Sequence, residues 1–208
     1  TLETPKYIHD KLVKSEITSV NLIVDISNYV MIELGQPTHA FDRDKINGKL
    51  SIKPNYKKNI FIGIDNKEYV IDKGMPVIID EKNNIHALPG VIGSKLSAVN
   101  ASTKSILFES AFFIPDVVRA ISRKFRIQTD SSFRFERGVD YNLCNDALRR
   151  IHYLLRKVLP VESCKISKIS QKHPITKPKS FNFEYKLFER ILGLELNIKK
   201  IKAYLINL

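Results

Sequence analysis

The sequence has few cysteines and no long apolar stretch, and both shortages limit what the protein can be. Only Cys144 and Cys164 occur in its 208 residues, which is too few for a disulfide framework and lacks the spacing of metal ligands. We expect free thiols. No apolar run approaches bilayer length, and the first residues lack the charged start and apolar centre of a signal peptide. We therefore expect a cytoplasmic protein with no membrane partner.

Patterns typical of metal and nucleotide sites are also missing. The histidines are not spaced as metal ligands, and no cluster of acids resembles a magnesium site. Gly90 and Gly93 follow a predicted strand, but they form no GxGxxG fingerprint and no phosphate-loop lysine follows them. Two glycines three residues apart let a backbone approach a ligand closely, or they simply build a turn. We expect no metal and no cofactor in this chain.

Positive charge exceeds negative charge by a wide margin. The 34 Lys and Arg residues against 22 Asp and Glu give a formal net charge of +12. This favours an anionic partner such as RNA, because clustered basic side chains release counterions from phosphates. A solvated lysine face without a partner explains the same excess, so both interpretations stay open. The 43% of hydrophobic residues is that of an ordinary globular protein with a sizeable core.

The most informative stretch begins with a helical pattern and ends at a histidine. Apolar residues at helical spacing predict a helix over residues 22–34. Gly35 ends this helix, and Pro37 prevents it from resuming. We expect His39 in an irregular turn just past the helix end. There its ring either caps local carbonyls or presents a nitrogen to a ligand or a water near neutral pH.

Strand patterns fill the middle of the chain, and helical patterns flank them. The expected hairpins, buried strand and helices cover residues 60–71, 77–88, 105–113, 115–125 and 143–158. Because helices at both ends enclose a run of hairpins, we predict an α+β fold with a mixed, mainly antiparallel sheet and helices packed on it.

The composition changes towards the C-terminus. Residues 1–165 form the main predicted domain, and the Lys-, Pro- and Ser-rich residues 166–180 form a predicted linker. Short amphipathic helices within residues 181–208 predict the start of a small second α+β domain. Since this segment is too short to complete a core, we expect the chain to be a fragment of a longer polypeptide.

Three ordered blocks carry a resemblance to a known family. They are residues 24–42 (VDISNYVMIELGQPTHAFD), 87–93 (ALPGVIG) and 129–140 (TDSSFRFERGVD). These blocks resemble the B3/B4 region of the bacterial phenylalanyl-tRNA synthetase beta chain, and the segment after residue 181 resembles the start of its B5 domain. The resemblance implies an α+β fold and a part of phenylalanine-tRNA ligase that binds tRNA(Phe). It also implies an alpha chain partner in an alpha2-beta2 heterotetramer, with ATP and magnesium bound elsewhere in that enzyme.

Glu109 lies in an apolar run, where an unpaired carboxylate is costly to desolvate. It either pairs with an arginine or faces a cavity and accepts a hydrogen bond from a ligand hydroxyl. The resemblance favours the second reading, because the family's glutamate at this place recognises the phenolic hydroxyl of tyrosine. It also implies that His39 lies near the amino acid and its ester, that Gly90 and Gly93 wall the pocket, and that the Ser27 hydroxyl helps to fix the substrate.

The implied activity is proofreading. A largely apolar synthetic site cannot strongly reject tyrosine, which adds only a hydroxyl to phenylalanine. A second site with a buried acceptor inverts this preference, since phenylalanine would leave the acceptor unpaired. We therefore expect hydrolysis of mischarged tyrosyl-tRNA(Phe), with His39 and Glu109 as the catalytic pair.

Three departures from the family pattern keep rival functions open. Ser27 replaces the usual Thr, Ser94 the usual Gly, and Phe133 the usual His. One rival is a tRNA-positioning scaffold whose editing has decayed, and another is a free-standing RNA-binding domain; a third is a stand-alone protein with a different aminoacyl substrate. In the block 129–140 we expect an irregular strand or turn whose charges pair internally, although its alternation of Arg and Phe also suits stacking on RNA bases.

Overall fold

The computed structural model describes residues 3–159, 180, 182–195 and 197–207. Contacts divide the chain into two compact units, Thr1–Cys164 and Lys165–Leu208. Apart from residue 180, the predicted linker lies outside the described residues, so the predicted domain boundaries stay a prediction. Within the described ranges, no helix has the length and apolarity needed to cross a bilayer.

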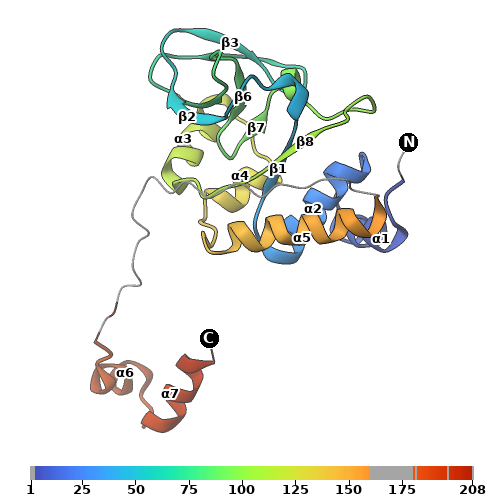
Figure 1. Cartoon of the computed structure of the whole chain (residues 1–208). Coiled ribbons are helices and arrows are strands. Elements are labelled where there is room, and N and C mark those ends of the chain that lie inside the picture. Colours follow the sequence, from blue (N-terminus) through green and yellow to red (C-terminus); the bar gives the residue numbers. More distant parts are fainter. Residues whose placement is uncertain (1–2, 160–179, 181, 196, 208) are drawn as a thin grey trace. The chain divides into compact units, whose positions relative to one another are not determined.

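The first unit combines helices and strands, and the predicted α+β class is confirmed (Figure 1). Its helices are α1 (Lys6–Lys14), α2 (Leu22–Leu34), α3 (Pro115–Phe125), α4 (Asp130–Phe135) and α5 (Leu143–Val158). Its strands are β1 (Thr38–Asp42), β2 (Ser51–Pro54), β3 (Asn59–Ile62), β4 (Glu68–Ile71), β5 (Pro76–Ile79), β6 (Ile85–Leu88), β7 (Ile92–Gly93) and β8 (Ile106–Ser110). Single turns of 3-10 helix are η1 (Arg43–Lys45) and η2 (Lys95–Ser97).

The strands form three small sheets instead of the one mixed sheet expected. Their orders are β1-β8, β2-β5-β6-β7 and β3-β4, and every pairing is antiparallel. Short connections account for the antiparallel β3-β4, β5-β6 and β6-β7 pairings, because parallel pairing needs a crossover of a dozen or more residues. The β2-β5 and β1-β8 pairings join strands that lie further apart in the sequence. The predicted hairpins are confirmed as β3-β4 and β5-β6. In Figure 1 the β1-β8 pair runs between the other strands and the layer of α1, α2 and α5.

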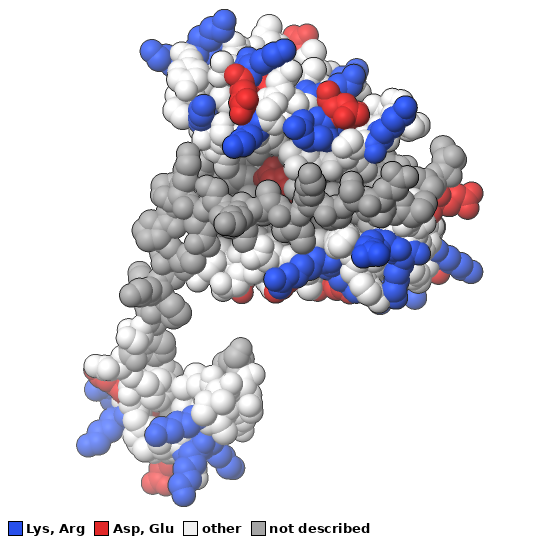
Figure 2. All heavy atoms as spheres, in the orientation of Figure 1, with Lys and Arg blue, Asp and Glu red and all other residues white. Residues whose placement is uncertain are grey.

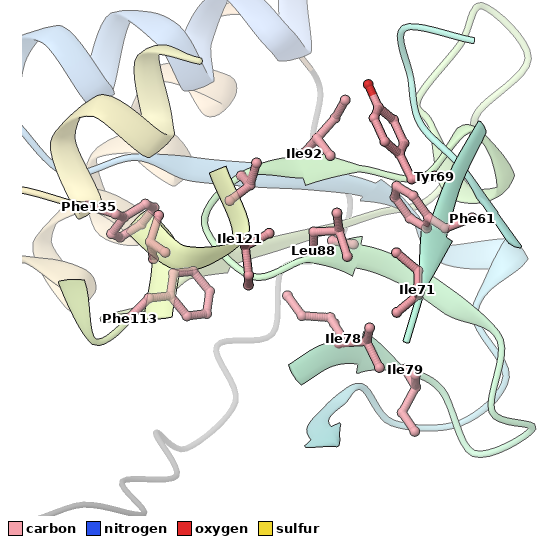
Figure 3. Packing of buried hydrophobic residues seen from close by; sticks show 14 of the residues in the cluster. Phe61, Tyr69, Ile71, Ile78, Ile79, Leu88, Ile92, Phe113, Ile121 and Phe135 are labelled. Atoms are coloured by element: carbon pink, nitrogen blue, oxygen red, sulfur yellow. The ribbon is translucent and has the colours of Figure 1, made fainter. Parts of the chain in front are cut away.

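Two hydrophobic cores lie in this unit. The larger one joins the strands to α3 and α4, and aromatic rings meet edge to face within it (Figure 3). Phe113 and Phe135 have ring centroids 4.9 Å apart at an interplanar angle of 72°. The smaller core lies between α1, α2 and α5, where Ile26 and Leu154 are buried and Phe108 of β8 packs against the cluster. The β1-β8 pair therefore separates the two cores.

Helix α2 has the predicted bounds because both of its ends are encoded locally. At the start, the Asn21 side chain accepts hydrogen bonds from the backbone N–H groups of Ile23 and Val24, at 3.1 and 3.0 Å. At the end, Gly35 adopts the left-handed conformation with φ 70°, which favours glycine. This helix ends three residues before the strand that carries His39.

Removing the cap should weaken the fold measurably. We expect Asn21→Ala to lower the free energy of unfolding by about 1 kcal/mol, because two N–H groups lose their acceptor. Asn21→Asp should retain most of the stability, since its carboxylate can accept the same bonds. Urea unfolding followed by circular dichroism measures both variants. Equal losses for the two substitutions would contradict the capping role.

Two local predictions are wrong. His39 lies in strand β1 and not in an irregular turn, because residues 38–42 pair with β8. The start of the block 129–140 forms helix α4 in place of an irregular strand or turn, since Thr129 and Ser132 build a reciprocal capping box. The internal pairing of its charges is confirmed, with Arg134 and Asp130 3.2 Å apart and Arg137 and Glu136 2.7 Å apart.

The second unit contains the two predicted short helices, α6 (Tyr185–Leu192) and α7 (Ile198–Ile206). Helix α6 ends at Gly193, which has φ 67°. Large apolar side chains of both helices are exposed, Ile191 at 69% and Ile206 at 82%. The described part of this unit thus has helices without a closed core.

Candidate functional site

The β1-β8 pair gives the site its geometry. Side chains alternate between the two faces of a strand. Phe41 and its partner Leu107 belong to the larger core, whereas Phe108, one position further along β8, packs on the smaller core. His39 and Glu109 therefore share the face of Phe41 and Leu107, which points towards the strands.

His39 and Glu109 lie directly opposite each other across the two strands. Cβ atoms of such partners are about 5 Å apart, so the sequence-distant imidazole and carboxyl are neighbours. Both side chains are partly accessible to solvent. Among the ion pairs of the described residues, none includes Glu109. The alternative of a structural ion pair with an arginine therefore finds no support in this part of the chain.

Burial shifts the acid–base behaviour of both groups. It raises the pKa of the Glu109 carboxyl from its ordinary 4.5 to about 7, because the surrounding protein disfavours the charged form. Burial likewise lowers the pKa of the His39 imidazole from 6.5 to about 4. At neutral pH the histidine is thus uncharged, and the glutamate exists in both protonation states. Perturbed groups that face each other are a recognised sign of a functional site.

These shifts predict opposite pH dependences of stability. The folded state binds the Glu109 proton more tightly than the unfolded chain, so this group's contribution falls as pH rises from 4.5 to 7. The unfolded chain binds the His39 proton more tightly, so that contribution falls as pH drops from 6.5 to 4. Between pH 4.5 and 6.5 the two slopes oppose each other.

Removing Glu109 or His39 should reveal how the other group alone makes the stability depend on pH. We expect Glu109→Gln to lose about 1–2 kcal/mol of stability between pH 6.5 and 4.5, a discounted value because both side chains keep some solvent contact. His39→Asn should gain stability over the same interval. Urea unfolding at several pH values measures both. Parallel profiles for the two variants and the parent would contradict the shifts.

Gly93 supplies one wall of the pair. A Cβ built on Gly93 would lie 2.6 Å from Nε2 of His39, closer than such atoms approach, so the Cε1–Nε2 edge of the imidazole lies directly against the glycine. The ring of Phe41 contacts the imidazole edge to face, with centroids 4.4 Å apart. The Gly93 carbonyl accepts a 3.0 Å hydrogen bond from the Ile64 N–H. The imidazole is therefore held between a buried phenyl ring and a strand that needs glycine.

Gly90 lies differently from Gly93. It forms the turn between β6 and β7 with φ +70°, and a Cβ there would lie 3.0 Å from Phe113 and Phe135. The side of Gly90 that a larger residue would occupy thus faces the aromatic core. Its predicted part in the pocket wall stays a prediction, and the structure assigns it a role in the turn.

Ser27 contacts the pair only indirectly. Its hydroxyl and that of Thr38 share a 2.6 Å hydrogen bond, and Ser27 is buried on α2. Because Thr38 precedes His39 in the strand, its side chain points to the opposite face, towards the helices. The bond ties α2 to β1 behind the imidazole. The proposed contact of Ser27 with substrate stays a prediction.

Ser94 stiffens the wall that Gly93 begins. This buried residue caps η2, where its hydroxyl accepts a 3.1 Å hydrogen bond from the Leu96 N–H. The same hydroxyl lies 3.4 Å from the Ile62 carbonyl of β3. A serine in place of the family's usual glycine thus links β7 to the neighbouring hairpin.

Sequence reasoning missed three supporting residues. Thr38 holds Ser27, Phe41 contacts His39, and the buried Gln36 donates a 2.9 Å hydrogen bond to the Ala111 carbonyl just after β8. Two of them could have been found, because a strand assignment for residues 38–42 places Phe41 on the face of His39 and Thr38 on the other. The Gln36 contact spans 75 positions, and no local pattern signals it.

A groove of the first unit lies beside this pair and not over it. It has a volume of about 840 Å³ between the β3-β4 hairpin and the larger sheet, and neither His39 nor Glu109 lines it. Its wall includes Ser94, the residue after Gly93. Within the described residues, no set of three or more His, Cys, Asp or Glu side chains is placed to hold a metal ion.

Comparison with known proteins agrees with this architecture. The family model described as the B3/4 domain matches residues 1–160. The chain belongs to the B3/4 domain family. This match covers the whole first unit up to its described end, including His39, Glu109 and both glycines.

Curated relatives of this B3/4 chain include bacterial phenylalanine–tRNA ligase beta subunits. That of Neisseria meningitidis serogroup A is 39% identical over 155 residues, 74% of this chain and 20% of the relative. That of Neisseria meningitidis serogroup B is 33% identical over 205 residues, which are 99% of this chain and 26% of the relative. The Wolbachia protein (Brugia malayi strain TRS) is 38% identical over 167 residues, 80% and 21%. The chain thus spans 20 to 26% of these relatives.

A solved structure is similar as well. An N-terminal fragment of the phenylalanyl-tRNA synthetase beta-subunit from Pyrococcus horikoshii shares 17% identity, with a TM-score of 0.40 over 87% of this chain and 53% of that chain. The resemblance read from the sequence blocks is confirmed by the family match and the curated relatives.

Proposed function

We propose that this chain carries a proofreading site that hydrolyses tyrosyl-tRNA(Phe) as part of a phenylalanine–tRNA ligase. The observation that supports it is the pairing of His39 with Glu109 across β1 and β8, with both groups shifted in pKa by burial. Such a pair combines an acceptor for a phenol with a neutral imidazole for the ester. The relatives' name supplies the enzyme to which the site belongs.

Glu109 selects the substrate in this proposal. Its carboxylate accepts a hydrogen bond from the tyrosine hydroxyl, which compensates the cost of keeping the acid away from water. A phenylalanyl group makes no such bond and leaves the carboxylate unpaired. The site therefore favours the amino acid that an apolar synthetic pocket rejects poorly.

His39 acts at the ester. As a neutral ring it orients a water, or polarises it, for attack on the carbonyl carbon that joins tyrosine to the terminal ribose. The bond between this carbon and the ribose oxygen breaks, the ribose oxygen takes up a proton from the attacking water to become a hydroxyl, and tyrosine leaves as the free acid. Because such esters are already labile, positioning suffices and no covalent nucleophile is needed. Gly93 forms the wall of the proposed pocket beside the imidazole. Gly90 shapes the turn that leads to this wall, and Ser27 supports β1 from behind through Thr38.

The proposed partners follow from the family. The chain acts on tRNA(Phe) and associates with the synthetase alpha chain, in an alpha2-beta2 assembly in the cytoplasm. Neither metal nor nucleotide takes part at this site, and ATP and magnesium serve aminoacylation in other parts of the enzyme.

Deacylation by the intact enzyme tests the proposal. We expect His39→Ala to slow the hydrolysis of tyrosyl-tRNA(Phe) about tenfold or more, because the water loses its partner. His9→Ala is the matched control, since His9 lies half-exposed on α1. Rates are measured by release of labelled tyrosine under single-turnover conditions. A parental rate for the His39 variant would refute the catalytic assignment.

A tRNA-positioning module without hydrolysis is the second candidate. The observation in its favour is that the groove of about 840 Å³ lies beside the pair and is not lined by it. This candidate predicts no tyrosyl-ester hydrolysis by the parental enzyme above the uncatalysed rate, together with intact binding of the tRNA. The same assay therefore separates the two functions.

A further inference from the structure

The groove beside the candidate site has a composition of its own. Three lysines, Lys57, Lys82 and Lys95, lie on its lining, and no Asp or Glu is among the described residues that line it. All three side chains are exposed. In the described part of the chain, no carboxylate forms an ion pair with any of them. The groove therefore presents positive charge that no neighbouring acid neutralises.

The charge of the groove lining differs from that of the surrounding surface. Glu81, the acid next to Lys82 in the sequence, lies against Gly48 and outside the groove. On the face shown in Figure 2, basic and acidic side chains are interspersed over the strand-rich part of the first unit. A lining that excludes acids stands apart from this mixed surface. Its charge is complementary to a polyanion.

Between the lysines the groove offers a stacking surface and amides. Tyr56 is 63% exposed and Ile60 is 67% exposed, and both line the groove. Asn83 and Asn84 on the β5-β6 turn bring side-chain amides to the same lining. A basic groove that carries an exposed aromatic ring is the usual form of a site for single-stranded nucleic acid. An acidic protein partner would match the charge of the groove, but it has no nucleobases that could stack on Tyr56.

The groove adjoins the His39 and Glu109 pair through the chain itself. Ser94, Lys95 and Leu96 line it and directly follow Gly93, which lies against His39. The β3-β4 hairpin on its other side is bonded to Gly93 through the Ile64 N–H. A strand of RNA lying in the groove would thus run along the wall that holds the imidazole.

We propose that this groove binds a single-stranded RNA segment, with Lys57, Lys82 and Lys95 on the phosphates and Tyr56 stacked on a base. The identification of this RNA as the unpaired end that bears the ester rests on the proposed function. The binding of single-stranded RNA does not, because it needs no hydrolysis. RNA bound in the groove would therefore extend to the wall of the candidate site that Gly93 forms.

Salt dependence of binding tests the lysines. The full-length protein is titrated with an unacylated, 4-thiouridine-substituted oligoribonucleotide of about 12 nucleotides, a length within the range of single-strand sites. We expect the triple variant Lys57→Gln, Lys82→Gln, Lys95→Gln to flatten the slope of log K against log[salt] by about 2, since each phosphate contact on a single strand contributes about 0.7. The matched control neutralises Lys45, Lys49 and Lys104, which are exposed outside the groove. Equal changes in the two triple variants would overturn the proposal.

Tyr56 is tested separately from charge. Tyr56→Ala should weaken binding about tenfold at every salt concentration without changing the slope, while Tyr56→Phe should bind as the parent does. Photocrosslinks from the thiouridines should fall within residues 54–62, 82–85 and 94–96, which separates this groove from other RNA contacts of the full protein. Crosslinks only elsewhere, or equal competition by double-stranded RNA or polyglutamate, would refute a single-strand site.

The outcomes distinguish this inference from the proposed function. Loss of binding in the groove variants with no parental deacylation supports the groove and rejects the editing site. Parental deacylation together with unchanged binding in the groove variants rejects the groove and leaves the editing site in place.

Discussion

The enzyme that carries Glu109→Ala is expected to lose its preference for tyrosyl over phenylalanyl esters by about 10- to 100-fold, because a hydrogen bond to a charged acceptor contributes about 1.5–3 kcal/mol. The loss should come from slower tyrosyl-tRNA hydrolysis, since a phenylalanyl group has no hydroxyl with which to make this bond. Glu68→Ala is the matched control, an exposed acid on β4. An unchanged ratio of the two rates would remove Glu109 from the specificity site.

The same residue should set the pH profile. Because the carboxyl has a pKa of about 7, its acceptor form becomes more populated as pH rises through neutrality. The tyrosyl rate, divided by the uncatalysed ester hydrolysis at each pH, should therefore rise between about pH 6 and 8. Glu109→Gln should abolish this rise and retain part of the preference, because a neutral amide oxygen still accepts a weaker bond. A rise that persists in the Gln variant would point to a different titrating group.

Gly93→Ala is expected to disable the site by displacing the imidazole of His39. The new methyl group would overlap the His39 ring, whose Nε2 lies 2.6 Å from the Cβ position. The ring cannot simply retreat, since Phe41 contacts it edge to face. We expect the tyrosyl-tRNA hydrolysis rate to fall at least as far as in His39→Ala, with a loss of about 1–3 kcal/mol in stability, as for other overpacked positions. Deacylation and urea unfolding measure the two effects.

A double-mutant cycle provides the control for Gly93. In a His39→Ala background the imidazole is gone and the added methyl group has space. The stability cost of Gly93→Ala should then fall close to zero, which gives a coupling of the same size as the original loss. If the cost is equal in both backgrounds, the overlap with His39 is not its cause.

The elements that could be predicted are those with local signals at both ends. Helix α2 could be predicted because an apolar helical pattern is followed by Gly35 and Pro37, and the Asn21 cap found in the structure fixes its start. The hairpins β3-β4 and β5-β6 were found from alternation around turn formers, and Asn66 and Asn83 in those turns have positive φ, at 63° and 62°. Such features depend on a few adjacent residues, so they can be predicted from the local sequence without knowledge of tertiary contacts.

The elements that escaped prediction depend on distant partners. Strand β1 follows a glycine and a proline and exists because β8, about 70 positions later, pairs with it. Helix α4 is only six residues long and rests on the Thr129 and Ser132 cap, a serine variant of the usual signal that ends in Glu or Gln. The residues of the candidate pair could be named from the resemblance, whereas their opposition across two strands was visible only in the fold.

The pairing of β1 with β8 makes the number of residues between Gly35 and His39 critical. Each side chain faces one core or the other according to its parity along the strand, so losing a single residue between Gly35 and His39 would turn the imidazole towards the helices and Thr38 towards the strands. A shift of that kind would also part the imidazole from Gly93 and bring a hydroxyl to the place where the ring belongs. A substitution in this segment changes one contact, whereas a deletion would exchange the two faces of strand β1 at once.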